Sequence, residues 1–438
     1  MKSLRKTCFA LITILLLFGC ENEIEINEVD NFKQNTVLGI SKEDLHPVDF
    51  ERLSSRYNLN DVEFVKIDVD KLLNGATLEY ESNNTSFSLE IEQIKTEKTS
   101  IEGFEEEFSH LKIKTVIPTS EAIEFEQGSL VVTKNLKVII GYLKVGEKTI
   151  SVTTVRDDIY MLQTINDIAN EIDDVERLDL YKNSLNLDNE NNQIKKVASG
   201  SRSEIKLGLI LSKQTDKYIN ISEQFKNFGN QWIVDYYIKY LFSLLARVDL
   251  NTQYRSNQTG VYFNVVVYLE DRGIHSRVQD INYAYKYPRR IPDQLDLVHY
   301  IAPKGVSYTG VAGGFNGFDS ISRETLTFSE YTLAHEIGHC FGMYHDWPAD
   351  NYKSCLHGTY IFLTFIGQPK IPLLRTIMAT PLYRKGYSRV DIFSTPDLNS
   401  STFQFGVDCS STATTVPDGP ANNHSIIAVK GPIIATWK

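Results

Sequence analysis

The stretch that decides the fold runs from residue 335 to residue 346 and reads His-Glu-Ile-Gly-His-Cys-Phe-Gly-Met-Tyr-His-Asp. His335 and His339 are four residues apart, so a helix over this stretch places both imidazoles on one face, one turn apart. Two imidazoles placed in this way can share a metal ion. Glu336 is one position further round the helix, beside that ion, where its carboxylate can hold a water molecule.

The third histidine reaches the same ion only if the helix ends before it. On a straight helix, His345 would lie about 15 Å along the axis from His335. Gly342 lies between them, and glycine accepts the positive φ that ends a helix in a sharp turn. The chain then folds back and brings His345 to the other two histidines. Upstream, Thr327-x-x-Glu330 fits a capping box and predicts where this helix begins.

This spacing is specific. The chain has 9 histidines in 438 residues, and three of them fall within this stretch. A bare HExxH is only suggestive, whereas the full string is a zinc signature. Three neutral imidazoles leave Zn²⁺ one open position, as catalytic rather than structural zinc sites do. We therefore predict one catalytic Zn²⁺, with Glu336 as general base for the zinc-bound water and later as proton donor to the leaving amine.

The string HEIGHCFGMYHD resembles the HExxHxxGxxHD signature of the metzincin metallopeptidases, and the Asp after the third His resembles their adamalysin (reprolysin) branch. Thr376-Ile377-Met378 is similar to the methionine turn of that family. The resemblance covers residues 204–438 and implies an α/β (α+β) metzincin-like zincin catalytic domain. It implies a zinc endopeptidase for protein or peptide substrates, and an extended substrate would add as a strand against residues 306–312. The site residues it implies are the zinc ligands His335, His339 and His345, the general base Glu336, and the structural residues Gly342, Asp346 and Met378.

The sequence departs from the family pattern at two positions. Cys340 stands where adamalysins usually have Asn, and Thr380 replaces the Tyr that astacins and serralysins use as an extra zinc ligand. The second departure argues against those two branches. Residues 21–339 contain no cysteine, which excludes a cysteine-switch zymogen like that of the matrix metallopeptidases.

Two other classes of function remain open. One is an adhesion or binding lipoprotein with a structural zinc, although such a role needs neither Glu336 nor Gly342. The other is a zinc exopeptidase, or a hydrolase of non-protein substrates that shares the zinc site. Residues 347–377 and 379–390 should wall the cleft, and specificity cannot be read from them.

The two halves of the chain have different secondary-structure patterns. The C-terminal half is α/β, with a long amphipathic helix predicted over 230–249 and strands over 205–211, 261–269, 297–302 and 305–313. The N-terminal half alternates with period two and predicts a mostly β domain over 36–185, with strands at 86–92, 110–116, 129–140, 148–155 and 159–165. A polar stretch, 186–203, reads as the linker to the catalytic domain at 204–438.

The first residues predict export. Lys2, Arg5 and Lys6 precede a ten-residue apolar run that is too short to span a bilayer. Leu17-Phe18-Gly19-Cys20 resembles the bacterial lipobox. We predict a signal peptide over 1–19, a lipid on Cys20 and a tether over 20–35. This makes the chain an exported bacterial lipoprotein held at the outer membrane, on its periplasmic face or at the cell surface. An ordinary secretory signal is the alternative.

The cysteines agree with export. Once the signal is removed and Cys20 is lipidated, Cys340, Cys355 and Cys409 remain. An exported compartment permits disulfides. We favour the pair Cys355–Cys409, because Cys340 lies inside the signature helix, and three unpaired thiols are the alternative.

Composition and charge limit the partners. With 42% hydrophobic residues the chain can build a packed core, and its net charge of −11 argues against nucleic acid as a partner.

The two halves of the chain differ in charge: residues 21–200 carry a net charge of −17 and residues 201–438 carry +3. Opposite charge steers association, so we predict that the N-terminal domain docks on the catalytic domain and restrains it, as in a zymogen. Cleavage in the linker, at Lys195-Lys196 or Arg202, would release it. A permanent spacer or substrate-binding domain is the alternative.

Overall fold

The computed structural model describes residues 36–82, 86–101, 103–117, 123–145, 148–165, 202–225, 230–271, 294–303, 310–312, 319–324, 327–328, 331–346, 357–364, 369–379, 389–400, 403–413 and 418–436. The predicted signal peptide, Cys20, the tether, most of the linker, Cys355 and Thr380 lie outside these residues. The contacts group Thr36–Lys438 into one compact unit, and the predicted boundaries at 185 and 204 remain predictions. Within the described residues, no helix is both long enough and apolar enough to cross a membrane.

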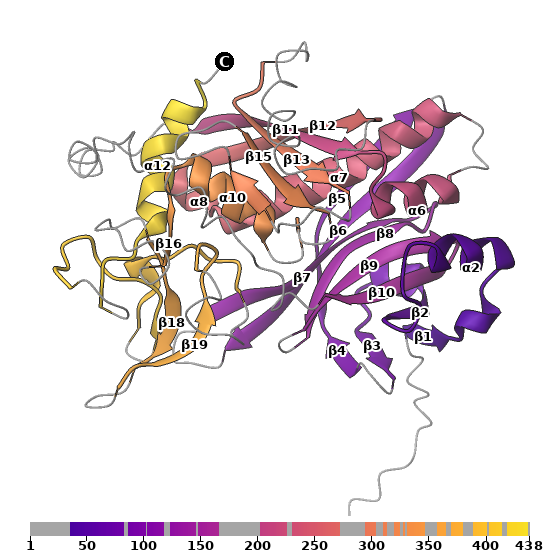
Figure 1. Cartoon of the computed structure of the whole chain (residues 1–438), viewed down its shortest axis with the longest axis horizontal. Helices are drawn as coiled ribbons and strands as arrows, with labels where there is room; N and C mark the ends of the chain where they lie inside the picture. Colours follow the sequence, from indigo (N-terminus) through magenta and orange to yellow (C-terminus); the bar gives the residue numbers. More distant parts are fainter. Residues whose placement is uncertain are drawn as a thin grey trace, which may run out of the picture. The chain divides into compact units, whose positions relative to one another are not determined.

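A five-stranded sheet organises the C-terminal region, in the order β12-β11-β13-β15-β14 (Figure 1). Its first four strands run parallel, and three of them, β11, β12 and β13, are rich in apolar residues, as buried parallel strands are. The short strand β14 pairs antiparallel with β15 and ends the sheet. The strands predicted at 205–211, 261–269 and 297–302 are confirmed. Of the stretch predicted at 305–313, the structure describes residues 310–312, near its C-terminal end, and these form a strand. The bounds are β11 (Ser203–Ser212), β12 (Val261–Glu270), β13 (Leu297–Ala302), β14 (Gly310–Ala312) and β15 (Asp319–Arg323).

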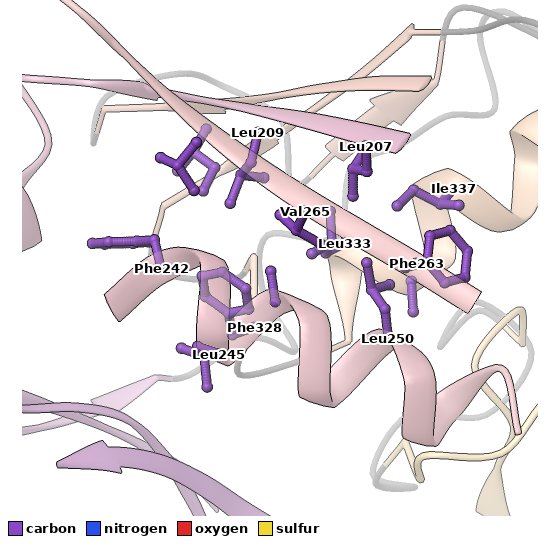
Figure 2. Packing of buried hydrophobic residues seen from close by; sticks show 14 of the residues in the cluster. Leu207, Leu209, Phe242, Leu245, Leu250, Phe263, Val265, Phe328, Leu333 and Ile337 are labelled. Carbon is purple, nitrogen blue, oxygen red and sulfur yellow. The ribbon is translucent and has the colours of Figure 1, made fainter. Parts of the chain in front are cut away.

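The long helix α7 (Gln231–Gln253) packs against this sheet and confirms the predicted amphipathic helix. Asn230 caps its first turn by accepting a hydrogen bond from Trp232 N–H. Figure 2 shows Phe242 and Leu250 of α7 beside side chains of β11 and β12, with Leu333 and Ile337 of the signature helix in the same cluster. Burying one such side chain stabilises the fold by about 1.5–3 kcal/mol. The signature helix is therefore anchored in the main core.

The signature helix α10 (Thr332–Cys340) packs against β14 and β15, and the remaining C-terminal elements are short. β18 is central in a three-stranded antiparallel sheet ordered β19-β18-β20, and β16 pairs in parallel with β17. These elements are α6 (Asp216–Gln224), α8 (Ser256–Thr259), β16 (Tyr344–Asp346), β17 (His357–Gly358), β18 (Tyr360–Leu363), β19 (Ile371–Arg375), the 3-10 helix η8 (Pro396–Leu398), β20 (Phe403–Gln404) and α12 (Asn423–Ile434).

The N-terminal region is strand-rich, as predicted. Eight antiparallel strands form a sheet ordered β1-β2-β10-β9-β8-β7-β6-β5, and a separate hairpin pairs β3 with β4. The elements are β1 (Val37–Ile40), η1 (Lys42–Asp44), α2 (Pro47–Ser54), β2 (Val62–Ile67), α3 (Val69–Leu73), β3 (Leu78–Glu81), β4 (Ser86–Leu89), β5 (Ile91–Ile101), β6 (Phe104–Ile117), β7 (Ile123–Thr133), β8 (Ile139–Val145), β9 (Lys148–Arg156) and β10 (Ile159–Ile165).

Two of the predicted strands are wrong in extent. The stretch 129–140 contains a hairpin turn between β7 and β8, because Lys137 adopts φ 50° and Val138 N–H is held by the Thr133 hydroxyl at 2.8 Å. The carboxylate of Glu106 accepts the N–H groups of Asn135 and Leu136 inside this turn, both at 2.9 Å. The stretch 86–92 is likewise divided, since β4 belongs to the small hairpin and β5 to the large sheet. In 86–92 the alternation of apolar and polar residues continues through Glu90, so the pattern concealed this break.

The strand-rich region and the C-terminal region share one hydrophobic core, in which Phe108 stacks against Tyr237 of α7 with 5.9 Å between ring centroids. Ion pairs also cross between the regions, and they run in both directions. Glu97 of β5 accepts from Arg247 of α7 at 2.7 Å, whereas Arg56 after α2 donates to Asp216 of α6 at 2.7 Å. Contact between the regions therefore rests on apolar packing and local ion pairs. The net charge of each half does not determine which region supplies the acidic partner of a pair.

Candidate metal centre

The signature helix begins later than the capping box predicts, and that prediction is wrong. The residue before α10 is Tyr331, at φ 56°, and no side chain caps the helix. The Thr327 hydroxyl instead donates to the carbonyl oxygen of Arg323 at 2.8 Å. Leu333 N–H reaches back to the Thr327 carbonyl at 2.8 Å. Because the threonine hydroxyl is used by the preceding turn, it is not available to cap α10.

The helix ends where the sequence places its reversal. Gly342 has φ 89°, its N–H donates to His339 C=O at 2.9 Å, and Met343 N–H donates to Gly338 C=O at 3.0 Å. This pair of bonds is a Schellman motif, which needs a left-handed residue just past the helix. The chain turns back directly into β16, which carries His345.

Gly342→Ala is expected to lower the affinity for zinc about tenfold, because a side chain in the left-handed conformation costs about 1–2 kcal/mol and His345 depends on this turn. Competition with a zinc-chelating dye measures the affinity. Gly75→Ala is a matched control, since Gly75 has φ 81° with open space around it and lies far along the chain from the site. Equal zinc affinity in the two variants would contradict this role for Gly342.

The three histidines of the signature converge. His345 Nε2 lies 3.2 Å from His335 Nε2 and 3.0 Å from His339 Nε2. The three rings are 3–6% exposed and form the one group of potential metal ligands found in the described part of the chain. With Zn–N bonds of about 2.0–2.1 Å, donor atoms of a tetrahedral zinc site lie about 3.3 Å apart. The observed spacing fits that geometry.

Backbone carbonyls fix the orientation of two of these rings. His335 Nδ1 bonds the Ile377 carbonyl at 2.8 Å, and His339 Nδ1 bonds the Met343 carbonyl at 2.8 Å. A carbonyl oxygen only accepts, so each Nδ1 carries the proton and each neutral ring keeps its lone pair on Nε2. Hydrogen bonds of this kind are what orient histidine ligands at metal sites. The donor set therefore fits zinc in number, chemistry and tautomer.

Met378 lies fully buried beneath the signature helix. A Cβ built at Gly338 would lie 2.6 Å from Met378 Sδ, so only glycine allows the sulfur to approach the helix this closely. The neighbouring Ile377 supplies the carbonyl that holds His335. The turn predicted from Met378 thus contacts the helix between the two paired histidines.

The carboxylate of Glu336 lies between α10 and the edge strand β14. Glu336 is 1% exposed, and a Cβ built at Gly310 would overlap its Oε1. The same Cβ would lie 2.7 Å from Thr332 Cγ2. Gly310 therefore makes room for the carboxylate, and this function was not predicted from the sequence.

His357 is a second residue that sequence reasoning missed. Its Nδ1 donates to the carbonyl oxygen of His345 at 2.6 Å, and its own carbonyl accepts from Ser394 Oγ at 2.5 Å. His357 is fully buried and holds the backbone of the third histidine. The sequence gives one indication of this role: histidine is rare, with 9 in the chain, and His357 follows His345 by only twelve residues.

The other predicted site residues are placed as follows. Asp346 is the last residue of β16 and pairs in register with Gly358 of β17. Cys340 is a free, buried thiol that contacts the Asp319 carbonyl at 3.8 Å, and burial raises its pKa well above the ordinary value, so it stays protonated. Cys409 is disulfide-bonded, and its predicted partner Cys355 lies outside the described residues.

A match to a known protein family agrees with this geometry. The family model described as Metallo-peptidase family M12B Reprolysin-like matches residues 272–363, about a fifth of the chain, including the whole signature. Among solved structures, metalloproteinase-II from Bacteroides fragilis is similar, with 14% identity over 64% of this chain and 85% of that chain and a TM-score of 0.31. No curated protein matches the sequence. The family match supports a metallopeptidase-like domain of mixed α/β content, and such a family implies a metal and protein or peptide substrates.

Proposed function

We propose that this chain is a zinc endopeptidase in which Glu336 is the general base. The observation that carries the proposal is the convergence of His335, His339 and His345 beside the buried carboxylate of Glu336. His335, His339 and His345 would hold the ion. Zinc, when bound, supplies a Lewis acid that polarises a carbonyl and makes water nucleophilic at neutral pH.

The chain's own groups supply the proton transfers and the positioning. The Glu336 carboxylate would take the proton of the attacking water and return it to the leaving amine. It is held against the backbone of Gly310, so its side chain has little freedom to move. Met378 supports α10 from beneath, which keeps the histidines and the base in a fixed relation.

The edge strand β14 supports a polypeptide substrate. It ends the five-stranded sheet and pairs on one side with β15. An extended peptide can add to such an edge through main-chain hydrogen bonds whatever its side chains are. Because Gly310 of β14 touches the Glu336 carboxylate, a peptide bound along this edge would pass the base in mid-chain, which favours internal cleavage over removal of end residues.

Metal removal tests the proposal. Phenanthroline should abolish cleavage of a peptide library, and added zinc should restore it. His339→Ala should lose both zinc and activity, whereas His46→Ala, an exposed histidine at the start of α2, should keep both. Cleavage confined to terminal residues would favour the exopeptidase, and zinc binding with no hydrolysis would favour the binding lipoprotein. Hydrolysis that resists every chelator would contradict a metal-dependent mechanism.

We further propose that the enzyme is exported and anchored by a lipid on Cys20. The support is the sequence alone: a basic start, a short apolar run and the lipobox-like Leu17-Phe18-Gly19-Cys20. Labelled fatty acid should enter the wild-type chain and not Cys20→Ala, with Cys8→Ala as control. Equal labelling of the wild type and Cys20→Ala would leave an ordinary secretory signal.

A further inference from the structure

A basic cavity lies apart from the zinc ligands. It has a volume of about 470 Å³ and is lined by the second half of α7, the turn into α8, and single residues of β5 and β12. Four cationic side chains line it, namely Lys95, Arg202, Arg247 and Arg255. The whole chain carries −11, so this cluster runs against the overall charge. Like charges around one cavity repel each other unless an anion offsets them.

One carboxylate offsets part of this charge. Glu97 of β5 accepts from Arg247 Nη2 through both of its oxygens at 2.7 Å, and it also pairs with Lys95. The single carboxylate of Glu97 is therefore shared by two cations, Arg247 and Lys95. The cavity keeps a positive excess that its own ion pairs do not remove.

The other two arginines have no carboxylate within ion-pair distance in the part of the chain that the structure describes. Arg202 Cζ lies over the ring of Tyr262, 4.6 Å from its centroid, which is a cation–π contact and does not neutralise the charge of the guanidinium. Arg255 is partly buried, and burial lowers its pKa although Asp391 and Asp397 act in the opposite direction. A partly desolvated guanidinium that has no directly paired carboxylate costs free energy, and a bound anion would recover it.

We propose that this cavity binds a phosphate monoester carried on a polar body about the size of a sugar. A phosphate monoester carries about −1.5 to −2 at neutral pH, so it offsets the excess charge better than a carboxylate or a sulfate ester, each of which carries one charge. Planar guanidinium groups bond phosphate oxygens in pairs. The volume lies in the range of pockets for small organic ligands, about 300–1,000 Å³. Tyr262 and the exposed amides of Asn257 and Gln258 line the remainder and suit a polar body.

Calorimetric titration of the full chain tests the assignment with three ligands that share one sugar body: glucose 6-phosphate, glucose 6-sulfate and glucuronate. Glucose 6-phosphate should bind most tightly, and added salt should weaken its binding. Arg202→Gln and Arg255→Gln should each weaken it at least tenfold. Lys95→Gln should weaken it as well, whereas Lys98→Gln, on the opposite face of β5 with its side chain 79% exposed, is the matched control.

Three results would overturn the assignment: no saturable binding of glucose 6-phosphate at millimolar concentration, equal affinity for glucuronate, or unchanged affinity in the arginine variants. If Arg255→Gln fails to fold, the exposed Arg202 and the strand residue Lys95 still carry the test. The readout is heat of binding, so the outcome does not depend on zinc loading or on peptidase activity.

Discussion

Glu336→Ala is expected to lower kcat/KM for peptide cleavage by about 10³-fold while the protein keeps its zinc. General-base catalysis contributes about 10²–10⁴-fold, and the carboxylate is not among the groups that would hold the ion. The three histidines and the carbonyls that orient two of them are untouched by the substitution. Zinc content by elemental analysis and steady-state kinetics on one peptide measure the two quantities together.

Gly310→Ala provides a matched test, because it leaves the carboxylate in place and disturbs its position. A methyl group at Gly310 would overlap Glu336 Oε1, so the side chain must shift. We expect an intermediate loss of kcat, smaller than that of Glu336→Ala, again with full zinc content. Near wild-type activity in Glu336→Ala would remove the general-base assignment, and loss of zinc in that variant would show that the carboxylate has a structural role.

The sequence predicted the centre of the site well, because helix periodicity and the conformational freedom of glycine are local properties. The four-residue spacing of His335 and His339 and the turn at Gly342 need no knowledge of the rest of the chain. The start of α10 is different. The Thr327 hydroxyl could cap a helix or bond Arg323 C=O, and the tertiary structure decided between these two local options.

The residues that were missed act over long separations in the sequence. Gly310 gives room to Glu336 and Gly338 gives room to Met378, and both functions exist only once the strand, the helix and the methionine turn have been brought together. His357 holds the backbone of His345 with its Nδ1. The parallel pairing of β16 and β17 brings the two residues together, and these very short strands have no recognisable sequence pattern. Close approach of backbones and buried carbonyl partners cannot be read from periodicity.

The hairpin between β7 and β8 was missed for a related reason. Its turn is built from Asn135, Leu136 and Lys137 without a glycine, and the Glu106 carboxylate from β6 satisfies its N–H groups. The stabilising group is thus almost thirty residues away in the sequence. The sequence also did not predict which region supplies the acid in each ion pair between the two regions. Net charge sums over all residues of a half, including those that make no contact with the other half.

Removal of the strand-rich region is expected to have the second large effect, a loss of the folded state. Phe108, Val131 and Tyr142 are fully buried in the core that they share with α7, and each contributes about 1.5–3 kcal/mol through burial. Against a typical total stability of about 5–15 kcal/mol, the loss of several such contacts leaves little. A chain beginning at Ser203 should therefore aggregate or lack a cooperative thermal transition, whereas the full chain should show one.

Polar contacts at the same place lead to the same expectation. Ser129 Oγ of β7 donates to Asp249 Oδ1 of α7 at 2.6 Å, and burial raises the pKa of Asp249 to about 7. Truncation would expose this carboxyl and the aromatic side chains of α7 to water.

A restraint built on charge alone would be released by salt, but apolar packing is not weakened by salt. If the region restrains the enzyme, as we predict from the sequence, trypsin cleavage at Lys195-Lys196 or Arg202 should leave both fragments associated at high salt, and only denaturant should separate them. A soluble, cooperatively folding 203–438 fragment, or separation of the cleaved chains by salt, would show that the two regions fold independently and that charge holds them together.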